Sequence, residues 1–281
     1  MPLHDVSYQR FDGPRTGRYR RSWALARSSA TLLLKRRAFI LLLAACWVPA
    51  VVRAVQIYAA RQFPQAAAFI TVDAALWQKF ISQQVAFLPV LLVALYTGAG
   101  AIAEDVTSGA FVIYLSKPFS RVDYVIGKAI PIMSAILAVT LVPALSLLAI
   151  HLSVADDYAL IETSPLLPLS VVAYSVWVSL FFTLAVLSVS TLSRSGRVAG
   201  ACFMALALGS KIVAGALSRL RLDVPMTFLS IIDAAVDSAH LFFGDQASGE
   251  TPYLSFVAMT AFMLVCVAVV YRRLGAVEVT G

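Results

Sequence analysis

Long apolar segments alternate with short polar stretches along this chain. A helix that crosses a bilayer core about 30 Å thick needs roughly 20 apolar residues. The six segments that reach this length are Ala38–Ala60, Ile81–Ala103, Tyr124–Leu152, Leu167–Leu192, Val198–Leu217 and Tyr253–Tyr271. Because backbone polar groups in lipid must be satisfied within the chain, we expect helices rather than strands. The pattern predicts an all-α, polytopic membrane protein, with residues 1–37 preceding a transmembrane domain over residues 38–281.

The residues before the first span are polar and basic, and their second half has a helical period. Apolar residues near one face are Trp23, Ala26, Ala30, Leu33 and Leu34. The opposite side carries Arg20 and Arg27, and Arg21 adds another cation. This pattern predicts an amphipathic helix from about Arg20 to Leu34, lying in the headgroup plane. The alternative is a simple cytoplasmic extension of the first span.

The charge distribution predicts the orientation. The chain is 60% hydrophobic and 13% charged, with a formal net charge of +7. If both termini are cytoplasmic, 16 of the 22 basic residues fall on the inside, as the positive-inside rule requires. The basic excess therefore reflects topology and contact with anionic membrane lipid, and we find no nucleic-acid-binding motif.

Between the fifth and sixth spans lies a long outer segment, Arg219–Pro252, whose middle is apolar enough to suggest a seventh span. Asp233, Asp237 and His240 argue against a seventh crossing, as does the position of the basic pair Arg272–Arg273. A re-entrant or interface-lying helical segment fits better. Its two acids and His240 could form a metal or proton site, but a solvated helix face is the preferred interpretation.

The polar interruption Glu104–Lys128 between spans two and three is longer than a turn requires. Phe111, Tyr114 and Leu115 recur at helical spacing, and Pro118 would end that short helix. Ser120 and Asp123 then match the capping box that opens a new helix. We further expect close packing at Gly127 and a Lys128 side chain that snorkels to the interface.

These positions resemble a known family, the membrane permease subunits of ABC transporters of the type-2 export class. The matching residues are Glu104, Gly109, Leu115-Ser116-Lys117-Pro118, Ser120-Arg121, Tyr124 and Gly127-Lys128. The layout of elbow helix, six spans and long outer segment is also similar. One departure is Ala110-Phe111-Val112, where the family commonly has an acidic or Thr-Leu-Glu-like run.

The resemblance implies an exporter in which two six-span subunits pair, the second being another copy or a paralogous permease. Two cytosolic ABC ATPases, carrying ATP and Mg²⁺, would dock on the elbow helices and on a coupling helix over Glu104–Lys117. The implied coupling residues are Glu104, Asp105, Ser108, Gly109, Phe111, Tyr114, Leu115, Lys117, Pro118 and Arg121, and the elbow residues are Arg20, Arg21, Trp23 and Arg27. The translocation path would use spans two and five, with Gln83, Gln84, Tyr96, Thr97, Met204 and Lys211 available. The expected location is the plasma (inner) membrane of a bacterium.

The chain is not expected to be an enzyme. It lacks the G-x-x-x-x-G-K-[ST] phosphate loop, because Val122 stands where the first glycine should be and Ala129 follows Gly127-Lys128. No catalytic, cofactor-binding or metal-binding motif is evident. The alternative function is a stand-alone six-span secondary transporter or a scaffold for assembly of another membrane complex, although no internal repeat supports a secondary transporter.

Three further features of the spans allow alternatives. Arg53, deep in the first span, either snorkels to the outer headgroups or has a substrate or ion-pair role. Lys211 in the fifth span could meet an anionic substrate. Gly196 and Gly200, at GxxxG spacing, favour close helix packing rather than chemistry.

Overall fold

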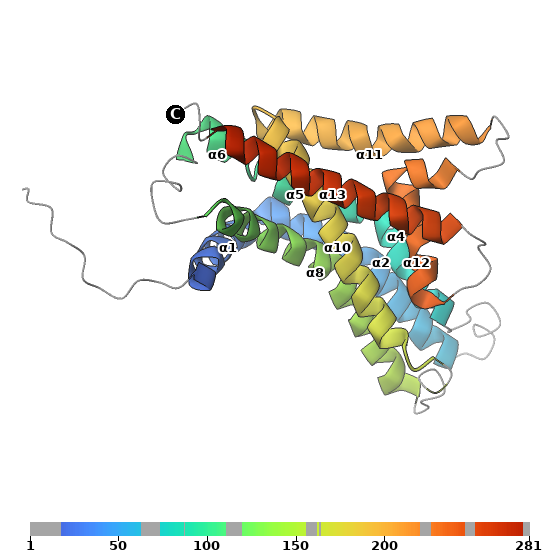
Figure 1. Ribbon diagram of the computed structural model, residues 1–281. Coiled ribbons are helices and arrows are strands. Elements are labelled where there is room, and N and C mark those ends of the chain that lie inside the picture. The colour runs from blue at the N-terminus through green and yellow to red at the C-terminus, as the bar shows by residue number, and fades with distance from the viewer. Residues whose placement is uncertain are drawn as a thin grey trace, which may run out of the picture.

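The computed structural model describes residues 18–62, 74–86, 88–110, 120–155, 162, 164–219, 226–244 and 251–277. Within these ranges every regular element is helical (Figure 1). The described part of the chain contains six helices long and apolar enough to cross a membrane. They are α2 (Arg37–Gln62), α5 with α6 (Pro89–Thr107), α8 (Arg121–Ala155), α10 (Leu167–Leu192), α11 (Gly196–Ser218) and α13 (Thr251–Val277). The predicted all-α, six-span architecture is confirmed.

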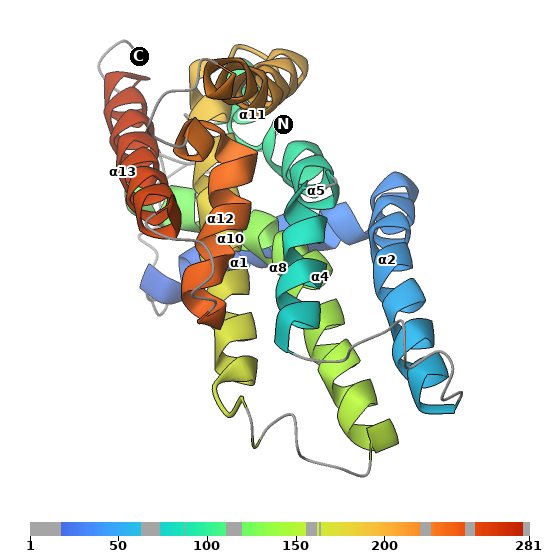
Figure 2. The ribbon, with the colours of Figure 1, turned by 90° about the vertical axis from the view of Figure 1, so that its right-hand side faces the viewer.

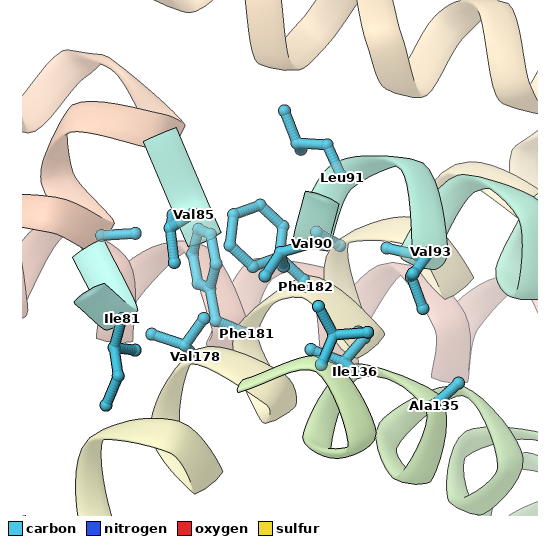
Figure 3. Packing of buried hydrophobic residues seen from close by; sticks show 14 of the residues in the cluster. Ile81, Val85, Val90, Leu91, Val93, Ala135, Ile136, Val178, Phe181 and Phe182 are labelled. Carbon is cyan, nitrogen blue, oxygen red and sulfur yellow. The ribbon is translucent and has the colours of Figure 1, made fainter. Parts of the chain in front are cut away.

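The centre of the bundle is α10, which packs against α8, α13, α5 and α11. Figure 3 shows the apolar side chains from α4, α5, α8 and α10 that meet there, among them Val90, Ile136 and Phe182. In the most apolar stretch of α10, 56% of the residues are buried, whereas in that of α2 only 17% are buried. The open face of α2 is therefore available to lipid or to a partner.

The second span differs from the prediction, because it is not one helix over Ile81–Ala103. The chain forms α4 (Ala74–Ala86), breaks, and resumes as α5 (Pro89–Gly98) before a turn leads into α6 (Ala103–Thr107). Leu88, at the break, has the left-handed φ of 74°. Pro89 favours this interruption, since proline lacks an N–H and disfavours the right-handed helical conformation at the residue before it.

Helix α1 (Arg18–Leu34) runs across the bundle, being seen nearly end-on in Figure 1 and lengthwise behind the other helices in Figure 2. It packs mainly on α8. Of the predicted apolar face, Ala26 is buried together with its neighbour Leu25, whereas Trp23 is 61% exposed. Arg20 and Arg27 are exposed, as the amphipathic pattern suggested, and Arg21 lies within the helix. The exposed Trp23 leaves an aromatic ring free for the bilayer interface.

The segment before the last span folds into the bundle. A 3₁₀ turn (η1, Met226–Leu229) leads into α12 (Ile231–Phe243), which is capped by Ser230 and ended by Gly244 at φ 71°. With 13 residues, α12 is about 20 Å long, too short to cross a bilayer core. It packs on α13, α4 and α11 (Figure 2).

The two acids and the histidine of α12 are half-buried, and each has a partner in the protein. The Asp237 carboxylate accepts hydrogen bonds from the hydroxyls of Thr227 (3.0 Å) and Ser255 (3.2 Å). Asp233 forms an ion pair with Lys211, and the ring of His240 is hydrogen-bonded to Gln78. Among the described residues, no group of three or more His, Cys, Asp or Glu could hold a metal ion.

Candidate functional site

The candidate site is the junction where α5, α6, the start of α8 and the loop before α11 come together, at the end of the bundle crossed by α1. Glu104 and Asp105 lie in the first turn of α6, and Ser108 follows this short helix. Gly109 then adopts φ +72°, a conformation that glycine takes without steric cost. The predicted coupling residues Phe111, Tyr114, Leu115, Lys117 and Pro118 lie outside the described residues.

A reciprocal capping box restarts the chain after this segment. The Ser120 hydroxyl accepts from the Asp123 backbone N–H at 3.2 Å, and the Asp123 carboxylate accepts from the Ser120 backbone N–H at 3.3 Å. This arrangement satisfies two amides that the first turn of a helix otherwise leaves unpaired. The predicted capping box is confirmed, and Arg121 is the first residue of α8.

A largely buried polar cluster joins α6 to α8. Lys128 Nζ lies 2.6 Å from Asp105 Oδ2, with the two side chains 12% and 18% exposed. The fully buried Tyr124 donates its hydroxyl to the same carboxylate oxygen at 2.8 Å. Lys128 Nζ also lies 5.8 Å from the centre of the Tyr124 ring. We call Asp105, Tyr124 and Lys128 the inner cluster.

The Lys128 ammonium is bonded to Asp105 and is not free in solvent. A charge-assisted hydrogen bond of this kind is stronger than one between neutral groups. The spacing of Tyr124 and Lys128, four residues apart on α8, places both on one helix face. The resemblance singled out these residues, but the sequence did not reveal Asp105 as their shared partner.

A serine of α10 completes the junction. The Ser190 hydroxyl donates to the Ala99 carbonyl at 2.8 Å and accepts from the amides of Ile102 and Ala103, each at 3.1 Å. These are the backbone groups released where α5 ends and α6 begins. Ser190 is fully buried, so no solvent replaces these bonds. Sequence reasoning missed it, since a lone serine in an apolar span gives no distinctive signal.

Glycines allow the helices to approach closely at this junction. A Cβ placed on Gly127 would lie 2.7 Å from Leu25 Cδ2 of α1. A Cβ on Gly196 would lie 2.8 Å from Glu104 Oε1 and 3.0 Å from the Cα of Gly100. The expected close packing at Gly127 and along Gly196 and Gly200 is present, and it brings α1 against α8 and α11 against the α5–α6 turn.

A cavity of about 260 Å³ opens between α1, α5 and α8 beside the inner cluster. Tyr96 and Thr97, two of the expected path residues, line it together with Arg36, Glu104 and Lys128. The Tyr96 ring also stacks on the Phe39 ring, with the ring centres 5.8 Å apart. The Thr97 hydroxyl donates to the Val93 carbonyl. The cavity thus connects the expected path residues to the expected coupling residues.

The other expected path residues lie elsewhere. Gln84 is buried on α4 and donates to the Cys46 carbonyl, while Gln83 accepts from Arg53. Met204 is half-buried on α11, and Lys211, further along α11, is exposed. The structure therefore brings Tyr96 and Thr97 to one cavity but does not gather all six residues around it.

The helices and the junction define a multi-pass α-helical membrane protein. A family model described as ABC-2 family transporter protein matches residues 23–276, so the chain belongs to this family. Among curated proteins, the search returned no match. The family assignment agrees with the resemblance drawn from the sequence and makes the chain a membrane permease subunit of the ABC transporter class.

Proposed function

We propose that this chain forms the translocation path of an ATP-driven exporter and couples it to a separate ABC ATPase through residues 104–120. The observation that carries the proposal is the inner cluster, in which Asp105 of α6 is held by Tyr124 and Lys128 of α8. A segment fixed at its base to a long membrane helix can transmit a displacement, whereas a freely hinged loop would absorb it.

Contacts at both ends of the segment support this view. At its beginning, Ser190 links the α5–α6 turn to α10, and Glu104 lies against Gly196 of α11. At its end, the capping box fixes Ser120 to α8. An ATPase that binds the segment differently in two nucleotide states would shift the membrane equilibrium by the difference in its binding free energies.

In this proposal both termini and the inner cluster face the cytoplasm of a bacterial cell, and α1 is the elbow helix on the inner leaflet. Two copies, or one copy with a paralogous permease, would pair and carry two ATPases that hold ATP and Mg²⁺. The chain itself hydrolyses nothing. The cavity beside Tyr96 and Thr97 would be the inner part of the path.

The first experiment uses the positive φ of Gly109. Tagged full-length chain, purified from native membranes, should carry an ABC ATPase with it. Gly109→Val should reduce both the captured ATPase and the transport-dependent ATP hydrolysis at least about fivefold, because a β-branched residue disfavours positive φ. Gly109→Asn is the matched control, since asparagine tolerates this conformation. A wild-type chain that captures no ATPase would contradict the proposal and favour the stand-alone transporter.

The second experiment tests the orientation. Ser108 is exposed, so a cysteine placed there should react with a membrane-impermeant maleimide only from the cytoplasmic side. The unsubstituted chain gives the background from Cys46, Cys202 and Cys266. Labelling of Ser108→Cys in intact cells would overturn the orientation.

A further inference from the structure

In the part of the chain that the structure describes, the arginine of the first span has neutral partners. Arg53 of α2 donates from Nη1 to the Gln56 side-chain oxygen and from Nη2 to the Gln83 side-chain oxygen, both at 3.1 Å. Gln83 belongs to α4, so the guanidinium bridges two helices. Within the described residues, no carboxylate forms an ion pair with Arg53.

Neutral partners orient a guanidinium but do not neutralise it. Two amide oxygens use two of the five N–H donors of Arg53 and leave its positive charge uncompensated. Arg53 is half-buried, so part of this residue remains accessible. A cation in a membrane-spanning segment is costly unless an anion or water reaches it.

The depth of Arg53 indicates where an anion could come from. It lies 16 residues after Arg37, the first residue of α2, and thus about 24 Å along the helix. In a core about 30 Å thick, this position is within a few ångströms of the opposite headgroup layer. Because α2 is the least covered of the six spanning helices, a lipid can approach it.

We infer that Arg53, held by Gln56 and Gln83, is a binding site for a phosphate ester, the headgroup phosphate of a phospholipid in the leaflet opposite α1. The fork of N–H donors on arginine matches the oxygens of a phosphate better than any other side chain does. A soluble phosphate ester could bind the same donors, and the experiment separates the two sources. This inference uses the proposed orientation only to name the outer leaflet and is independent of ATPase coupling.

The test is a binding titration of the purified full-length chain, delipidated in detergent and followed by native mass spectrometry. The probes are dioleoyl-phosphatidylglycerol, dioleoylglycerol, which lacks the phosphate, and glycerol 3-phosphate, which lacks the acyl chains. Wild-type chain should bind phosphatidylglycerol at least about tenfold more tightly than dioleoylglycerol, because a charge-assisted hydrogen bond depends on the phosphate. Competition by equimolar glycerol 3-phosphate would assign the site to soluble esters, and its failure to compete would assign it to lipid.

Two variants test the site directly. Arg53→Gln should abolish the preference for the phosphate-bearing lipid. Gln83→Glu should also abolish this preference while keeping the fold. Its carboxylate would form an ion pair with Arg53, and the neutralised guanidinium would then attract a phosphate less strongly. Lys79→Gln is the matched control, since Lys79 is an exposed cation on the same helix as Gln83 and should bind as wild type.

Equal binding of phosphatidylglycerol and dioleoylglycerol to the wild-type chain would overturn the inference. So would an unchanged preference in Gln83→Glu, provided that its thermal unfolding matches that of the wild type. Neither result would bear on the ATPase, which is absent from this assay.

Discussion

Two ion pairs of nearly equal length lie at opposite ends of the membrane domain, in different surroundings. Lys128 and Asp105 are separated by 2.6 Å, with side chains 12% and 18% exposed. Lys211 and Asp233 are separated by 2.7 Å, with side chains 46% and 33% exposed. Water competes for the second pair but hardly for the first. The distance between two charges therefore does not by itself measure how much the pair stabilises the fold. That contribution depends on how far water reaches the pair.

The neighbours of the two pairs differ as well. The inner cluster adds the buried Tyr124 hydroxyl to its carboxylate, and the adjoining turn is fixed by Ser190. Near Lys211 and Asp233, which we call the outer pair, Ser210 of α11 accepts a single hydrogen bond from the Ile231 amide of α12. The inner junction is thus suited to hold a fixed geometry, and the outer contact between α11 and α12 is suited to change.

The largest effect is expected from Lys128→Met. It leaves Asp105 as a mostly buried carboxylate whose one remaining side-chain partner among the described residues is the neutral Tyr124. Breaking a buried pair in this way costs roughly 3 kcal/mol. The free energy of unfolding should fall by about that amount, measured by denaturant unfolding of the purified chain in detergent. The double variant Asp105→Asn with Lys128→Met should recover much of the loss, because no charge is then unpaired. A single variant as stable as wild type would contradict the role of the inner cluster.

A smaller loss is expected from Ser190→Ala. Three backbone groups, the Ala99 carbonyl and the amides of Ile102 and Ala103, lose their partner in a buried site, which corresponds to about 2 kcal/mol of unfolding free energy. Hydrogen exchange at the Ile102 and Ala103 amides should accelerate. Ser179→Ala is the control, because this equally buried hydroxyl bonds only a carbonyl of its own helix. Equal losses in the two variants would show that the α5–α6 turn needs no support from α10.

Close packing at the inner half is tested by Gly98→Ala. A Cβ at Gly98 would lie 2.4 and 2.9 Å from the two Cγ atoms of Val186, whose branched side chain cannot rotate away freely. Overpacking of this kind costs about 1–3 kcal/mol. Gly209→Ala on α11 has nothing within 4 Å and should be neutral or slightly stabilising. If both variants unfold at the same temperature, the contact between α5 and α10 is looser than these distances indicate.

Local patterns predicted much of this architecture. The lengths of the apolar segments gave the six spans, Ser120 and Asp123 gave the start of α8, and small residues gave the close contacts of Gly127 and Gly196. Each of these signals acts over a few residues or one helix turn, so it can be read without knowing the partner helix.

The features that the sequence did not reveal depend on contacts between distant segments. Lys128 carries the same local pattern whether it reaches water or Asp105, and only the position of Asp105 beside α8 decides between them. Ser190 has significance because the turn between α5 and α6 lies beside it. The break in the second span is a different case. Pro89 is visible in the sequence, but the long apolar run around it favoured the prediction of one continuous helix.

The smallest effect is expected at the outer pair. Lys211→Met removes an exposed partner, and exposed pairs contribute about 0–1 kcal/mol, so the unfolding free energy should change by less than about 1 kcal/mol. Asp233→Asn should cost slightly more, because Asp233 also lies in the first turn of α12, where a negative charge interacts favourably with the helix dipole. High salt should reduce the difference between wild type and Lys211→Met but leave the loss in Lys128→Met nearly unchanged, because screening acts on exposed charges. A loss in Lys211→Met as large as that in Lys128→Met would mean that the outer pair is shielded in the assembled protein, and the two ends of the domain would then be equally rigid.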